Sequence, residues 1–137
     1  MAANTKGMGL LRGTTRVAEI LDISGPTFTR GVIDVTNADT QTGSTAAAYR
    51  EFIEDGYVDG GEVSATLNYV PGNTTQSVLQ GDMTASSAVA YSIAYKGTNG
   101  VTFNAFVTSY TPAAPGVGTA LSASVTLKLT GQYTATL

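Results

Sequence analysis

Polar and apolar residues alternate one by one between Glu62 and Tyr69. The polar set is Glu62, Ser64, Thr66 and Asn68, and the apolar set is Val63, Ala65, Leu67 and Tyr69. Successive side chains of an extended chain point to opposite faces, so this alternation predicts a β-strand with one packed face and one wet face. Pro71 and Gly72 end the predicted strand, because proline has no N–H to donate to a sheet and glycine adopts turn angles readily.

A short helix is predicted directly after this turn. Asn73 is a favourable N-cap residue. Gln76 follows three residues later, which suggests a variant of the capping box. The expected apolar stripe of the helix is Val78, Leu79 and Met83.

Five further stretches carry strand-like patterns, namely residues 14–23, 31–36, 88–96, 101–110 and 121–130. In the second of them, Ile33 and Val35 are expected to point inward and Asp34 outward. The Asn99-Gly100 dipeptide predicts a hairpin turn between the third and the fourth. Six strands and one short helix predict an all-β protein, built as a β-sandwich or a small barrel. At 137 residues, the chain is expected to form a single domain over residues 1–137.

Two segments lack this periodicity. Residues 1–13 contain three glycines and are expected to form a mobile N-terminal arm. Residues 37–48 are small and polar, and residues 49–59 are the most charged part of the chain. We expect residues 37–59 to form one long loop, and connections of that length in a compact domain are usually functional or disordered.

The composition indicates a surface with few charges. Charged residues make up 12% of the chain and apolar residues 42%, so uncharged polar groups, mainly hydroxyls, must cover the outside. Such a surface resists association weakly and suits a subunit that is covered by copies of itself. A β-sandwich that acts alone, as a binding module, remains the alternative at this point.

The sequence offers little for catalysis or metal binding. It has no cysteine and no histidine, which removes disulfides, thiolate chemistry, the usual general base and the commonest metal ligand. The acidic cluster consists of Glu51, Glu54, Asp55, Asp59 and Glu62. Its spacing does not match a calcium-binding loop, and it is read as a solvated or interface segment. We therefore expect no enzyme activity, no cofactor and no metal.

Charge and hydropathy also bear on partners. The net charge of −3 is the wrong sign for a surface that grips nucleic acid. The first residues lack the apolar core of a signal peptide, and no run approaches the ~20 apolar residues of a membrane span. We expect a protein that is made in the cytoplasm and has no membrane contact.

The segment from Arg50 to Gln76 combines a charged loop, a two-faced strand, a Pro-Gly turn and a capped helix. Its characteristic residues are Arg50, Phe52, Ile53, Asp59, Gly61, Glu62, Val63, Ser64, Asn68, Tyr69, Pro71, Gly72 and Gln76. In this order they resemble the major tail tube protein family of long-tailed, non-contractile bacteriophages.

The resemblance implies a structural virion protein of the phage tail, assembled in the host cytoplasm. Six copies would close into a ring, and rings would stack into a hollow tube through which DNA is ejected without specific binding. The implied partners are further copies of the chain, a tape-measure protein, and the tail terminator and tail tip proteins. The alternative is a carbohydrate-binding or adhesin-like sandwich, or a virion decoration domain.

Two sets of residues are predicted to serve such an assembly. The contacts between subunits or rings are assigned to the long loop, at Arg50, Phe52, Ile53, Asp55 and Asp59. The lumen lining is assigned to Asp34, Glu62, Ser64, Thr66 and Asn68, since a conduit for DNA should be neutral or acidic. The competing assignment places this polar face on the outside of the tube.

Overall fold

A computed structural model of the chain describes residues 7–36, 49–96 and 99–137. Within these residues it contains nine strands and one helix, which confirms the predicted all-β class. Seven strands form one curled antiparallel sheet in the order β2-β1-β7-β8-β9-β6-β3. Their bounds are β1 (Gly9–Arg12), β2 (Thr15–Arg16), β3 (Ile20–Ser24), β6 (Glu62–Asn68), β7 (Val89–Lys96), β8 (Asn99–Ala113) and β9 (Ser122–Thr136).

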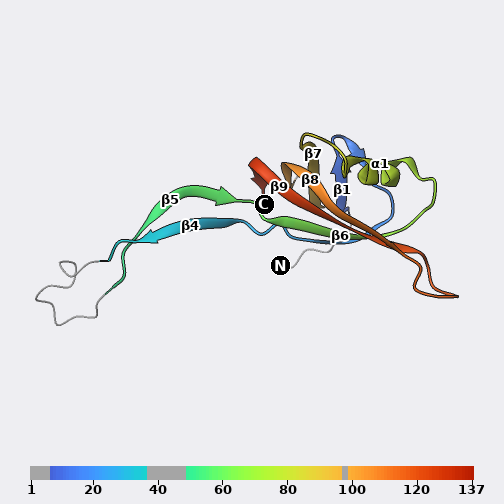
Figure 1. Ribbon diagram of the computed structural model, residues 1–137, viewed down its shortest axis with the longest axis horizontal. Coiled ribbons are helices and arrows are strands. Elements are labelled where there is room, and N and C mark those ends of the chain that lie inside the picture. The colour runs from blue at the N-terminus through green and yellow to red at the C-terminus, as the bar shows by residue number, and fades with distance from the viewer. Residues whose placement is uncertain (1–6, 37–48, 97–98) are drawn as a thin grey trace, which may run out of the picture.

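The two remaining strands form a separate hairpin. β4 (Thr29–Asp34) pairs with β5 (Phe52–Asp59), and the pair extends away from the rest of the molecule (Figure 1). The loop between β8 and β9 extends in the opposite direction, and helix α1 (Thr74–Asp82) lies against the body of the sheet. The molecule is therefore a compact body with a projection at each end of its long axis.

The hydrophobic core lies on one face of the curled sheet. β1 near one edge contacts β3 at the other, so the sheet forms an open barrel around the core. Alternate residues of the four long strands point into it, and α1 adds the fully buried Leu79. Core residues from the sheet include Leu10, Val63, Leu67, Tyr91, Ile93, Val101, Phe103, Val125, Leu127 and Leu129.

The alternation between Glu62 and Asn68 is confirmed. β6 buries Val63, Ala65 and Leu67 and exposes the polar residues between them. It pairs without a shift with β9 on one side, and with β3, through one register shift, on the other. The same alternation holds in β8 from Val101 to Val107. Period-two patterning thus predicted the long central strands and their faces correctly.

The helix begins where the sequence predicts. The Asn73 side-chain carbonyl accepts hydrogen bonds from the N–H groups of Thr75, at 3.0 Å, and Gln76, at 3.3 Å. The predicted apolar stripe is wrong in part, since Leu79 is buried while Val78 and Met83 are exposed. Leu79 is the buried apolar side chain by which α1 packs against the core, because this short helix covers only a small part of it.

The predicted capping-box role of Gln76 is wrong. Its side chain is buried and accepts a hydrogen bond from the Val70 N–H at 2.9 Å. Its amide group donates to the carbonyl oxygens of Ala18, at 3.0 Å, and Asn68, at 2.9 Å. Gln76 therefore joins α1 to the chain before β3 and to the end of β6.

The N-terminal part of the chain is more ordered than its pattern indicates. The expected arm over residues 1–13 contains β1, which pairs with β7 and buries Leu10 completely. The single strand expected over residues 14–23 is divided into β2 and β3, with Glu19 between them at a φ of 62°. Residues 1–6 and 97–98 lie outside the described residues.

The charged segment is a strand where a loop was expected. Residues 52–59 form β5, so the predicted loop over residues 37–59 is corrected, and its part from 37 to 48 lies outside the described residues. Ile33 and Val35 do not point into the core, and they are 49% and 36% exposed. Within the described residues no second layer packs behind the hairpin, and its apolar side chains Ile33, Phe52 and Ile53 are about half exposed.

Candidate assembly surfaces

The β4–β5 hairpin exposes apolar side chains on both of its faces. Phe52 lies opposite Asp34, and Ile53 lies opposite Ile33 in the next pair. Consecutive residues of a strand point to opposite sides, so Phe52 and Ile53 lie on different faces. Each side chain is 53% exposed to solvent. Exposure of apolar surface to water is unfavourable, so burial of these side chains by a partner would be favourable.

Charged residues frame these apolar groups. The Arg50 guanidinium donates to the Asp34 carboxylate at 2.8 Å, and Arg30 forms an ion pair with Glu54. Hydrogen bonds from Thr36, assisted by Arg50, lower the pKa of Asp34. Asp55 lies over Gly31 on the other face and accepts a hydrogen bond from the Tyr57 N–H at 2.9 Å.

The root of the hairpin is fixed to β9. The Phe28 ring stacks on Tyr133 with 4.2 Å between ring centroids. The Gly61 carbonyl accepts a hydrogen bond from the Leu129 N–H at 3.1 Å. Gly61 has a φ of 72° and lies against the Thr27 carbonyl, so only glycine fits there without strain. These contacts set the direction in which the hairpin leaves the body.

Asp59 lies at this root. Its carboxylate accepts a hydrogen bond from the Gly61 N–H at 2.8 Å and lies 3.6 Å from the Lys128 ammonium. The Gly61 hydrogen bond and, second, the Lys128 charge lower the pKa of Asp59. Of the predicted interface residues, Arg50, Phe52, Ile53 and Asp55 therefore lie along the hairpin and Asp59 at its root.

A polar surface covers the face of the sheet that points away from the core. We call this surface the polar wall, and its polar residues on β6, β8 and β9 are Glu62, Ser64, Thr66, Thr102, Asn104, Ser124, Thr126 and Lys128. The same face also carries an exposed aromatic residue, Phe106, which pairs with Lys128. Register places Ser64 beside Thr126, Thr66 beside Ser124 and Glu62 beside Lys128. The wall is thus lined mainly by hydroxyl and amide groups, with its opposite charges side by side.

The predicted lumen set is divided by the structure. Glu62, Ser64 and Thr66 lie together on the polar wall, with the half-buried Asn68 at the end of the same strand. Asp34 lies in the other sheet, beside Arg50 on the hairpin. The two parts share no strand pairing, so they form separate candidate surfaces.

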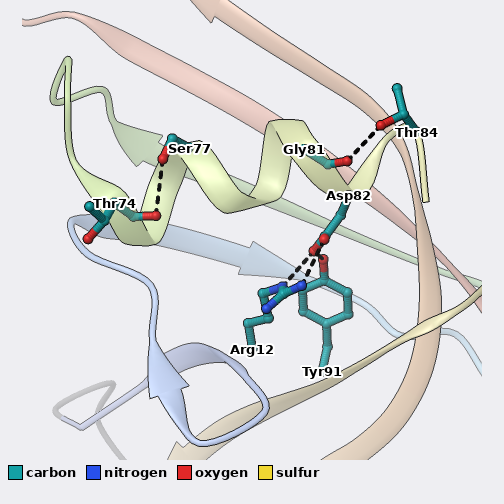
Figure 2. Close-up of polar contacts among 7 residues, drawn as sticks. All are labelled: Arg12, Thr74, Ser77, Gly81, Asp82, Thr84 and Tyr91. Atoms are coloured by element: carbon teal, nitrogen blue, oxygen red, sulfur yellow. Dashed lines mark hydrogen bonds and ion pairs between the residues drawn. The ribbon is translucent and has the colours of Figure 1, made fainter.

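Sequence reasoning missed a buried ionic cluster under α1, which Figure 2 shows. The Asp82 carboxylate is 8% exposed and accepts hydrogen bonds from Arg12 Nε at 2.8 Å and Arg12 Nη2 at 3.0 Å. The Tyr91 hydroxyl donates to the same carboxylate. The signal that could have revealed it is an acidic residue in the last turn of a helix, where the helix dipole disfavours a negative charge.

The cluster holds α1 against β1 and β7. Burial opposes ionisation of Asp82, but the hydrogen bonds from Arg12 and Tyr91 more than offset it and lower the pKa of this carboxyl. Burial and the Asp82 charge raise the pKa of Tyr91. Arg12 and Tyr91 both bond to the Asp82 carboxylate, so the arrangement ties the end of α1 to two strands and stabilises the fold.

Two negative findings concern the described part of the chain. In residues 7–36, 49–96 and 99–137, no three acidic, histidine or cysteine side chains gather as a metal site would require. Among the same residues, no helix has the length and hydrophobicity needed to cross a membrane.

An all-β subunit with uncovered apolar projections and a weakly charged wall belongs to the class of proteins that assemble with other subunits. A family model described as the lambda phage tail tube protein matches residues 11–136. The chain therefore belongs to the lambda phage tail tube protein family, whose members are structural components of the virion tail and not enzymes. No curated protein matches the chain.

Solved structures of related assemblies share the fold. The tail of an empty gene transfer agent particle, determined with helical refinement and C6 symmetry, has a TM-score of 0.78 at 15% identity, covering 99% of this chain and 100% of that chain. A native gene transfer agent virion gives 0.76 at 16%, with the same coverage. A sheath/tube terminator of an extracellular contractile injection system gives 0.71 at 14%, covering 98% of each chain.

Proposed function

We propose that six copies of this chain close into a ring, and that the rings stack into a hollow tail tube through which DNA is ejected. The observation that carries the proposal is the β4–β5 hairpin, which exposes Phe52 and Ile53 on opposite faces. A hairpin with apolar side chains on both faces buries all of them only when a neighbouring subunit packs against each face. The C6 symmetry of the gene transfer agent tail, which shares the fold, supports six as the ring number.

The hairpin is the proposed contact between subunits or rings. Phe52 and Ile53 supply apolar area, and Arg50, Asp55 and Asp59 supply charges that orient the partner. Burial of one such apolar side chain is worth about 1.5–3 kcal/mol, and the gain recurs at every copy around a ring. The fixed root at Gly61 and Phe28 supports this role, since a pre-oriented hairpin loses less entropy on binding.

The polar wall is the proposed lumen surface, at Glu62, Ser64, Thr66 and Asn68. Each basic group that neutralises a DNA phosphate adds affinity by counterion release, so repeated basic contacts would hold DNA in the tube. On the wall, Lys128 lies beside Glu62 and within 3.6 Å of Asp59, which balances its charge. Asp34 would reach the lumen only if the hairpin itself forms part of the lining.

The remaining assignments follow from a tube of this kind. A tape-measure protein would occupy the lumen before DNA, terminator and tip proteins would close the two ends, and assembly would take place in the host cytoplasm. The alternative function, a separate binding module, would instead require a glycan or another surface ligand as its partner.

Assembly of the purified protein tests the proposed function. Size-exclusion chromatography over a range of concentrations, followed by negative-stain microscopy, is expected to show rings with six-fold class averages and, at high concentration, tubes. A chain that stays monomeric at every concentration, or rings of another number, would contradict the proposal.

A further inference from the structure

A hollow of about 230 Å³ lies at one end of the polar-wall face, over β1, β7, β8 and β9. Half of its lining residues are apolar or glycine and half are polar. The first group is Leu11, Ile93, Ala94, Gly100 and Val101, and the second is Ser92, Asn99, Thr102, Thr134 and Thr136. A Cβ atom at Gly100 would collide with the backbone carbonyl of Ile93 on β7, so this position in the wall of the hollow requires glycine. Among residues 7–36, 49–96 and 99–137, no charged side chain lines the hollow.

The loop between β8 and β9 lies at the other end of the same two strands (Figure 1). We call residues 114–120 the tip. Val117 in the tip is fully exposed, and the flanking Gly116 and Gly118 have positive φ values of 145° and 83°. Residues 111–121 contain no charged side chain.

We propose that the tip of one subunit inserts Val117 into the hollow of a second copy in the adjacent ring. This contact rests on the proposed stacking of rings. The hollow and the tip are separated by the length of β8, which is roughly 45 Å at ~3.3 Å per residue. A second copy displaced along the strands by about that distance brings its tip over the hollow of the first. Such a head-to-tail contact leaves a free tip and a free hollow at the two ends, so it repeats without closing.

The chemistry of the hollow selects the tip over the other projection of the described chain. Burying a charge is costly even when it is paired, and the described lining of the hollow offers no charged partner. The β4–β5 hairpin carries Asp55 and the ion pair of Arg30 with Glu54, whereas the tip carries no charged residue. A valine between two glycines presents an apolar group to the apolar lining, and its exposed backbone can bond to the threonine hydroxyls at the rim.

Disulfide trapping tests the contact directly, because the chain has no cysteine of its own. A variant with Val117→Cys and Thr134→Cys, assembled at high concentration and mildly oxidised, is expected to give a ladder of dimers, trimers and longer chains on a non-reducing gel. The ladder arises because each subunit contributes one tip and one hollow. The matched control is Val117→Cys with Thr66→Cys, which places the second thiol on β6, on the same face but away from the hollow.

The outcomes separate this contact from the proposed function. Tubes of the test variant without a ladder, or a ladder of equal yield in the control, would overturn the tip contact and leave the tube function standing. Dimers alone would show that two tips meet each other, which also overturns it. A protein that forms neither rings nor tubes before oxidation would overturn both proposals.

Discussion

At the scale of single residues, Asp82 is the buried charged group that joins α1 to the sheet. It is buried and bonded to Arg12 and Tyr91, which come from β1 and β7. Asp82→Asn is therefore expected to lower the free energy of unfolding by about 1.5–3 kcal/mol, the usual contribution of a hydrogen bond to a charged group. Urea unfolding monitored by circular dichroism measures the change, and Asp22→Asn, at an exposed position on the edge strand β3, is the matched control.

The pH dependence of the same variant gives a second expected outcome. The pKa of Asp82 is lowered in the folded state, so its contribution to stability is present above the unfolded pKa of about 3.9 and is lost as the pH falls through the folded value. The difference in unfolding free energy between the wild type and Asp82→Asn should thus be constant near neutral pH and shrink below about pH 4. A difference that stays constant down to pH 2 would contradict an ionised Asp82 in the folded protein.

At the scale of elements, the β4–β5 hairpin carries the assembly hypothesis. Phe52→Ala and Ile53→Ala each remove an apolar group that is half exposed in the subunit, so the thermal midpoint of the monomer should hardly change. If neighbouring copies bury these groups, each change costs about 1.5–3 kcal/mol per contact and raises the concentration needed for assembly by roughly 10- to 100-fold. Sedimentation of tubes over a concentration series measures this threshold.

The control for the hairpin is Met83→Ala, which removes a similarly exposed apolar group beside α1. It should assemble like the wild type. Because Phe52 and Ile53 lie on opposite faces, the double variant should be more impaired than either single one. A Phe52→Ala protein that unfolds would instead place Phe52 in the core of the free subunit.

At the scale of the whole molecule, the proposal that the polar wall lines the lumen predicts how its charge affects DNA ejection. Glu62→Lys in virions is expected to leave tails intact but slow DNA ejection at low salt, because each ring then adds uncompensated positive charges. Added salt should relieve the defect, since it screens exposed charges and weakens phosphate contacts. Ejection from purified virions, followed by the release of DNA with time, is the measurement.

Two further variants sharpen that experiment. Glu62→Gln removes the negative charge without adding a positive one and should eject DNA nearly normally. Asp34→Lys places the new charge on the hairpin, beside Arg50, and should impair assembly before it affects ejection. Well-formed Glu62→Lys tails that eject DNA at the normal rate at low salt would remove the wall from the lumen.

The sequence alone determined the elements whose pattern is local. Alternation fixed the buried and exposed faces of β6 and the first half of β8, and Asn73 fixed the start of α1. The order of residues from Arg50 to Gln76 was sufficient to indicate the tail tube family that the comparison then showed. These features depend on residues that lie close together in the sequence, so they can be predicted without the three-dimensional structure.

Tertiary structure alone decided the elements that depend on distant partners. β1 and β5 are strands because β7 and β4 pair with them, although neither sequence alternates clearly. Arg12 and Asp82 meet across a separation of seventy residues. Asp34 was grouped with Glu62, Ser64 and Thr66 as lumen lining, although it lies in a different sheet from them. Backbone N–H and C=O groups and buried charges need partners, but those partners can come from any part of the chain that the fold places next to them. Such distant pairings produce no periodic pattern in the sequence.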